Sequence, residues 1–164
     1  MFADLVVAVN IGVVLAMLHF MRRMAGSVSV SRQNGALLDQ ELSALLQGRG
    51  LAGLPSDIMI YQVEGPLFYG AVETFEQALA GTGGLPAVLV VRLGRVPFID
   101  ATGLRTLENL VDSYQAKGGR VVLVEANERV RGKLRRMGLV EKLAGDPGAS
   151  LEQALGPLIE KASA

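Results

Sequence analysis

The sequence contains no cysteine, no tryptophan and a single histidine, His19. Without cysteine, the chain has no disulfide, no thiolate metal site and no thiol nucleophile. One histidine also excludes a zinc site built from several of them. Lys and Arg together number 16, as do Asp and Glu, so the formal net charge is zero. General nucleic-acid binders need excess positive charge to displace counterions from phosphates, so the balance argues against that class.

Apolar residues are in excess, and the excess is concentrated at the start of the chain. The mean hydropathy is +0.36, and residues 5–21 carry no charged side chain. Residues 2–20 would form a helix of about 28 Å at about 1.5 Å per residue, close to the bilayer core of about 30 Å. Arg22 and Arg23 follow at once, which places that end in the cytoplasm by the positive-inside rule. We therefore predict a transmembrane helix over residues 1–24.

Two other interpretations of this segment stay open. A secretory signal carries its positive charge before the apolar run, whereas here Asp4 precedes the run and arginines follow it. A buried helix of a soluble protein is the other alternative, because Asp4, Asn10 and His19 dilute the run. Asn10 and Gly12 suit a membrane helix packed against others, since a small residue permits close approach. His19 lies near the cytoplasmic end, where an imidazole fits the interface.

Residues 25–56 are predicted to be a linker that contains an amphipathic helix. A polar connector over residues 27–35 ends in a turn signal, and four leucines of residues 36–47 fall on one helical face. The next glycines match the G-x-G-x-x-G spacing: Gly48, Gly50 and Gly53. Dinucleotide binding needs a strand before this motif and a helix after it, which is the reverse of the order predicted here. We interpret these glycines as a helix end and a turn.

From residue 57 onward, predicted strands and helices alternate. The strands are expected at residues 58–63, 67–69, 87–93 and 120–124. The helices are expected at residues 71–80, 102–116, 127–137 and 151–162, the last with Pro157 as a candidate kink. The nearly continuous apolar run of residues 87–93 is typical of a strand with both faces covered. This alternation predicts an α/β domain over residues 57–164, with helices packed on a parallel or mixed sheet.

The loop before the helix at residues 102–116 carries a candidate site. Asp100 stands at the N-cap position, and a helix N-terminus presents free N–H groups and partial positive charge. Thr102 supplies a hydroxyl there, where a phosphate would change the surface sharply. In the alternative interpretation, Asp100 only caps the helix and Thr102 only stabilises its first turn.

Three segments resemble one protein family. Residues 96–104, VPFIDATGL, resemble the signature loop of STAS domains, which occur in sulfate transporters and anti-sigma-factor antagonists. Residues 64–70, EGPLFYG, resemble the second-strand segment of STAS domains attached to SulP-type anion transporters. Residues 2–16, with the following residues 22–24, resemble the last transmembrane helix of the same transporters. Because the matches follow the family's order, the chain resembles the C-terminal part of a SulP-type transporter, the last membrane helix plus the STAS domain.

The resemblance implies a STAS-like α/β fold, with a central mixed sheet of four or five strands flanked by helices, after one transmembrane helix and a linker helix. It implies a regulatory and protein-interaction domain on the cytoplasmic side of the cell (inner) membrane, without enzyme activity, cofactor or metal. The chain would be a fragment without the transport core. Expected partners are the transporter's membrane domain, a second copy in a homodimer, a cytoplasmic protein and the membrane, but no nucleic acid.

The resemblance also marks the loop as a regulatory and interaction surface. Its candidate residues are Pro97, Phe98, Asp100, Ala101, Thr102 and Gly103. In anti-sigma-factor antagonists, the residue directly after the loop aspartate is a phosphorylated serine. Here that residue is Ala101, so the phosphorylation switch does not carry over, and Thr102 is kept as a regulatory candidate.

A cluster of five basic residues follows in the helix predicted at residues 127–137. Its members are Arg129, Arg131, Lys133, Arg135 and Arg136. The simplest interpretation is a solvated helix face, and the alternatives are contact with anionic lipid, a nucleotide or an acidic protein.

For the whole chain, a membrane-tethered signalling protein like the anti-sigma-factor antagonists is the second hypothesis. An enzyme is the third, and the sequence lacks a P-loop, paired carboxylates and metal-ligand spacing.

Overall fold

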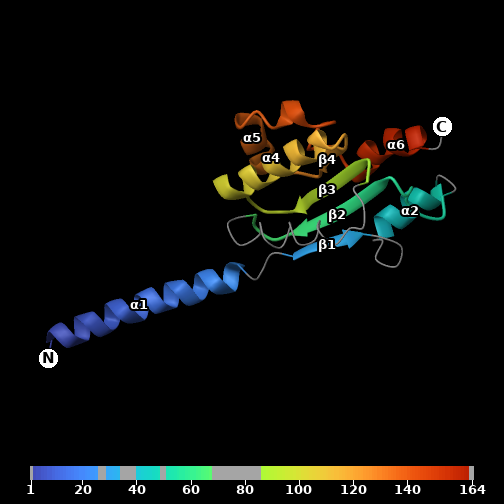
Figure 1. The fold of residues 1–164 in the computed structure, drawn as a ribbon. Coiled ribbons are helices and arrows are strands. Elements are labelled where there is room, and N and C mark those ends of the chain that lie inside the picture. Colours follow the sequence, from blue (N-terminus) through green and yellow to red (C-terminus); the bar gives the residue numbers. More distant parts are fainter. Residues whose placement is uncertain (1, 26–28, 34–39, 49–50, 68–85, 163–164) are drawn as a thin grey trace.

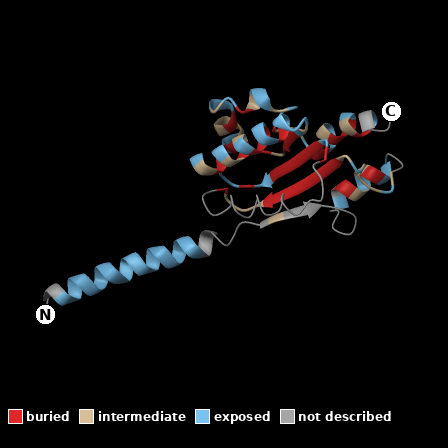
Figure 2. Cartoon of the chain, in the orientation of Figure 1, coloured by how far each residue is buried: buried red, intermediate tan, exposed pale blue. Residues whose placement is uncertain are grey.

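The computed structural model describes residues 2–25, 29–33, 40–48, 51–67 and 86–162 (Figure 1). A long helix, α1 (Phe2–Ala25), extends away from an α/β domain. Figure 2 shows α1 exposed over residues 4–22, and none of the segment Asp4–Arg22 is buried. By length and composition this segment could cross a membrane. Because α1 buries nothing against the domain, the alternative of a core helix of this fold finds no support.

The domain is built on a four-stranded sheet in the order β1–β2–β3–β4. The strands are β1 (Ser29–Gln33), β2 (Ile58–Glu64), β3 (Val88–Arg95) and β4 (Arg120–Val124). The last three run parallel, and β1 pairs antiparallel with β2. The described residues thus show a mixed sheet, with the strand number at the lower end of the predicted four or five.

Helices cover both faces of the sheet, as Figure 1 shows. On one face pack α4 (Ala101–Ala116) and α5 (Glu128–Arg136), and on the other α2 (Gln40–Gly48) and α6 (Leu151–Ala162). A short 3-10 helix, η2 (Val140–Lys142), follows α5. Alternate residues of each strand enter the two cores: Leu89 and Val91 face α4, whereas Val88 and Val90 face α6. Two-sided burial is why these strands read as continuous apolar runs.

The predicted linker contributes two elements to the domain. Residues 29–33, which we expected to lie in a polar connector, form β1, and Val30 packs against the α4 side of the sheet. Alternation of serine and valine there is a strand signal that a polar composition concealed. In α2, Leu42 and Leu46 are fully or almost fully buried against the other face.

The other predicted elements agree closely with the structure where it describes them. The observed β4 has the predicted bounds, and α6 runs through Pro157 without a break. Helix α4 begins one residue earlier than predicted, and α5 is one residue shorter than predicted at each end. Of the short strand predicted at residues 67–69, Leu67 forms a parallel bridge with Ile99. The rest of that strand and the helix predicted at residues 71–80 lie outside the described residues.

Tyr114 supplies a test of the α4 packing. It is buried on the sheet side of α4, and burial, followed by the neighbouring Tyr61, raises its pKa from 10.0 to about 12. The folded state therefore holds the phenol proton more tightly than the unfolded chain does. The resulting contribution to the free energy of unfolding is complete below pH 10 and is lost as the pH rises towards 12.

We expect the free energy of unfolding to fall more steeply above pH 10 in the natural chain than in a Tyr114→Phe variant, because phenylalanine has no proton to lose. Denaturant unfolding at a series of alkaline pH values measures both slopes. Equal slopes would contradict a raised pKa at Tyr114.

Candidate functional site

The predicted loop leaves the end of β3 and leads into α4. Val96 and Ile99 are fully buried beneath it, while Pro97 and Phe98 face outward. The Val96 N–H closes a turn on the Leu93 carbonyl at 2.9 Å. Phe98 is 37% exposed, and among the described residues outside α1 it is the one large apolar side chain that is exposed. Because Val96 and Ile99 are anchored in the core, the loop between them keeps the Phe98 ring in contact with solvent.

The loop is joined to the segment that follows β2 by backbone hydrogen bonds. The Leu67 N–H donates to the Phe98 carbonyl at 3.1 Å, and the Asp100 N–H donates to the Leu67 carbonyl at 3.0 Å. The Gly65 N–H donates to the Arg95 carbonyl at 3.1 Å. The two domain segments that carried the family resemblance thus lie side by side, although about thirty residues separate them in the sequence.

The start of α4 shows why the loop has its particular residues. The Asp100 carboxylate accepts a hydrogen bond from the Gly103 N–H at 2.8 Å, the capping contact that the sequence predicts. A side chain on Gly103 would meet the Leu67 carbonyl oxygen at 2.6 Å, so the helix can approach that backbone only with glycine there. Ala101 is exposed and Thr102 is half-buried on the first turn.

Helix α5 holds the other side of the loop through two polar side chains. Asn127 caps α5 by accepting from the Val130 N–H at 3.0 Å, and its amide donates to the Val96 carbonyl at 2.8 Å. Lys133 donates to the Ile99 carbonyl. We predicted Lys133 as a lipid or partner contact, but its ammonium group is engaged within the domain. Sequence reasoning missed Asn127, whose only signal was an N-cap residue before an amphipathic helix.

The remaining basic residues of α5 divide into two kinds. Arg131 pairs with Glu128 at 2.6 Å and with Asp146 at 3.5 Å, so its charge is offset locally. By contrast, Arg129, Arg135 and Arg136 are exposed, and no acidic side chain of the described residues forms an ion pair with them.

An ion pair that we did not predict, between the buried Arg92 and the partly buried Glu125, lies at the same end of the sheet. Arg92 of β3 makes two hydrogen bonds to Glu125, at 3.0 and 2.9 Å, directly after β4. The Glu125 backbone is left-handed with φ 60°, and a side chain on Gly94 would meet its carboxylate at 2.9 Å. Bidentate pairs of this kind fix geometry, so this one ties the end of β3 to the residue that follows β4. The sequence signal for this ion pair was Arg92, the one charged residue in the apolar run of residues 87–93.

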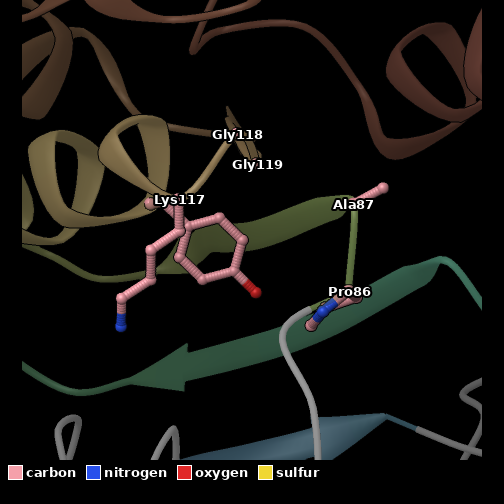
Figure 3. A pocket seen from close by; sticks show the side chains of 6 residues that line it. Pro86, Ala87, Lys117, Gly118 and Gly119 are labelled. Atoms are coloured by element: carbon pink, nitrogen blue, oxygen red, sulfur yellow. The ribbon is translucent and has the colours of Figure 1, made fainter.

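A hollow of about 250 Å³ lies at the opposite end of α4 (Figure 3). Lys117, Gly118 and Gly119 border it on the α4 side, and Pro86 and Ala87 border it before β3. The described residues contain no group of three His, Asp or Glu side chains arranged to hold a metal ion. The hollow therefore provides no second candidate site beside the loop.

The family profile of the STAS domain matches residues 53–154. The chain belongs to the STAS domain family. The STAS domain of a SulP transporter from Vibrio cholerae is 35% identical, with 76% of this chain and 98% of that chain covered and a TM-score of 0.66.

Two curated transporters are also similar to this STAS chain. The putative sulfate transporter YvdB of Bacillus subtilis is 25% identical over 85% of this chain and 24% of its own length. The bicarbonate transporter BicA of Picosynechococcus is 27% identical over 87% of this chain and 25% of its own length. The chain therefore spans about a quarter of the curated relatives that it matches, and it is homologous to the C-terminal regions of SulP-type transporters. These relatives are transporters and STAS domains rather than enzymes.

The close approach of Gly103 to Leu67 yields a prediction about stability. We expect Gly103→Ala to lower the free energy of unfolding by about 1–3 kcal/mol, because a methyl group there overpacks a backbone that has no room. Gly132→Ala in α5 is the matched control, since nothing lies within 4 Å of its added carbon. That variant should be neutral or gain up to about 1 kcal/mol of helix propensity. Denaturant unfolding measures both, and equal effects would show that the approach at Gly103 imposes no constraint.

Proposed function

We propose that this chain is the last membrane helix and the cytoplasmic regulatory and interaction domain of a SulP-type secondary anion transporter. The observation that carries the proposal is the order of the parts: an unburied apolar helix, then Arg22, then a STAS domain of the transporter type. Transport itself would require membrane helices that this chain does not contain. In this proposal, residues 1–24 span the bilayer, residues 57–164 form most of the STAS domain, and the connecting residues 25–56 complete it with β1 and α2.

The orientation of the chain follows from its charges. Arg22 is exposed at the end of the apolar segment, which the positive-inside rule places on the cytoplasmic side of the inner membrane. Only three residues separate the end of α1 from the first strand of the domain, because β1 starts at Ser29. It would therefore be held close to the cytoplasmic surface of the bilayer.

The exposed part of the loop is the contact surface that we propose for the rest of the transporter or for a cytoplasmic protein. Ala101 and Thr102 lie on the first turn of α4, which the contacts of Asp100 and Gly103 hold in place. A rigidly held exposed loop suits recognition, since little conformational entropy is lost when it binds. We also propose a second copy of the chain as a partner, in keeping with the symmetric assembly of most oligomers.

The named transporters among the relatives differ in their anions, sulfate in one case and bicarbonate in the other. We therefore propose the substrate class as inorganic anions and assign no member of it. A tethered signalling protein is the second candidate. Against it stands Ala101, which has no hydroxyl to phosphorylate at the position directly after the loop aspartate.

We expect the chain to resist alkaline extraction from membranes, and its domain to be digested by protease in inverted but not in right-side-out vesicles. Val13→Arg should release the chain, because an arginine at the centre of a spanning helix costs about 2.5–3.5 kcal/mol. Asn109→Arg on the exposed surface of α4 is the control with the same added charge. Release of the natural chain by alkali, or digestion from the outer side, would refute the assignment of α1 or its orientation.

The genomic DNA upstream of the Met1 codon separates the two candidates. A reading frame that continues into further apolar segments is expected for the transporter. A ribosome-binding site immediately before Met1, with a stop codon upstream in the same frame, would instead support the tethered signalling protein.

A further inference from the structure

Two of the unpaired arginines lie on the side of α5 that faces the loop. Lys133 marks this side, because it donates to the Ile99 carbonyl. Residues three or four apart share a helix face, which places Arg129 and Arg136 beside Lys133. Arg135 is two positions from Lys133 and therefore projects from the opposite side of the helix.

The loop adds apolar groups next to these charges. Ile99, which Lys133 contacts, is the immediate neighbour of Phe98, and Asn127 holds the Val96 carbonyl on the other side. We name Pro97, Phe98, Arg129 and Arg136 the loop-side patch. All four side chains are exposed.

The patch has positive charge that the domain does not offset. No described acidic side chain pairs with Arg129 or Arg136, and Glu128 is engaged by Arg131. The acid in the loop, Asp100, is directed at the Gly103 N–H of α4. The positive charge of Arg129 and Arg136 is therefore available to an anion that approaches the loop-side patch.

Exposed aromatic and arginine side chains together match the chemistry of a membrane surface. Aromatic rings are favoured at the level of the headgroups, and guanidinium groups form paired hydrogen bonds with phosphate. A second copy of the chain fits less well, since a two-fold contact centred on the patch would bring its unpaired arginines close to those of the partner copy. A nucleotide would need a concave site, whereas Phe98, Arg129 and Arg136 are all exposed, and the hollow beside Gly119 lies at the far end of α4.

The short connection between α1 and β1 would bring the loop-side patch close to the membrane. In Figure 1, β2 and β3 point towards the side of the domain from which α1 extends, and the loop follows the end of β3. Only three residues separate α1 from β1, the strand beside β2. The cytoplasmic leaflet carries anionic lipid, which attracts basic groups within about 10 Å at ordinary salt.

We propose that the loop-side patch docks on the anionic headgroups of the leaflet beside α1, with Phe98 at the interface and Arg129 and Arg136 on phosphates. This rests on the proposed insertion of α1. It leaves Ala101 and Thr102, on the first turn of α4, to protein contacts. Docking would fix the orientation of the domain beneath the membrane.

The absence of tryptophan makes the proposal directly testable. Phe98→Trp places a single tryptophan in the 164-residue chain, which is reconstituted in vesicles of phosphatidylcholine alone or mixed with phosphatidylglycerol. We expect a blue-shifted emission and quenching by brominated lipid only where phosphatidylglycerol is present. Gln47→Trp on α2, which packs on the other face of the sheet, is the control reporter and should be unaffected.

The two adjacent arginines provide a matched pair of variants on the Phe98→Trp background. Arg136→Gln should lower the ratio of docked to undocked domain about fivefold, the effect of one basic charge at an anionic surface. Arg135→Gln removes the same charge from the opposite side of α5 and should change the ratio less. Equal effects of the two variants would overturn the assignment of the docking face.

Two further results would contradict docking on lipid. An emission maximum that is the same in both vesicle types would show no contact. A shift that appears without phosphatidylglycerol and grows with protein density would show that a second copy covers the loop.

Two controls accompany the fluorescence measurement. Alkaline extraction of the same vesicles reports α1 insertion separately, so failure of the tether and failure of docking are distinguishable. If Phe98→Trp unfolds by circular dichroism, Ala101→Cys labelled with a polarity-sensitive dye reports the loop instead, because the chain has no other cysteine.

Discussion

The candidate surface depends on how closely two backbones approach each other at the end of the sheet. The start of α4 lies against the carbonyl of Leu67, a contact that leaves no space for a side chain on Gly103. That approach lets the Leu67 N–H and carbonyl bond the loop on both sides of Ile99. With Val96 and Ile99 anchored in the core, the residues between them are directed outward. The exposed position of Phe98 is therefore a consequence of packing elsewhere.

The basic helix α5 serves two purposes that its composition does not separate. Asn127 and Lys133 donate hydrogen bonds to carbonyl oxygens of the loop, and Arg131 pairs with the carboxylates of Glu128 and Asp146. These contacts hold the loop from the side opposite Leu67. What remains for binding is Arg129 and Arg136 on one side of the helix and Arg135 on the other. A charge cluster in a sequence thus overstates the number of charges that are available to a partner.

An anchored STAS domain differs physically from a free one. In the proposed topology, the three residues between α1 and β1 would confine the domain to a small volume next to the bilayer, where weak contacts act at high effective concentration. A few arginines and one aromatic ring, too weak to hold a free domain on a membrane, can orient a tethered one. Regulation of a transporter through such a domain would then act on an orientation that lipid charge and partner binding both influence.

Local chemistry was sufficient to predict most of the architecture. Residues 2–25 form the long helix that their uncharged run indicates, and the apolar runs at β3 and β4 form buried parallel strands. Asp100 caps α4 as its position before an amphipathic helix predicts. These features could be predicted because periodicity, hydropathy and capping act between residues near one another in the chain.

Contacts between distant residues could not be predicted in this way. Nothing local distinguishes Lys133, which holds a loop carbonyl, from Arg136, which lies exposed three residues later. The pairing of Arg92 with Glu125, and of β1 with β2, likewise joins segments about thirty residues apart. Such partners meet only after the strands align and the helices pack on them. The sequence alone therefore determined most of the elements and the family of this protein, whereas folding in three dimensions decided the place of β1 in the sheet and which charges are engaged internally.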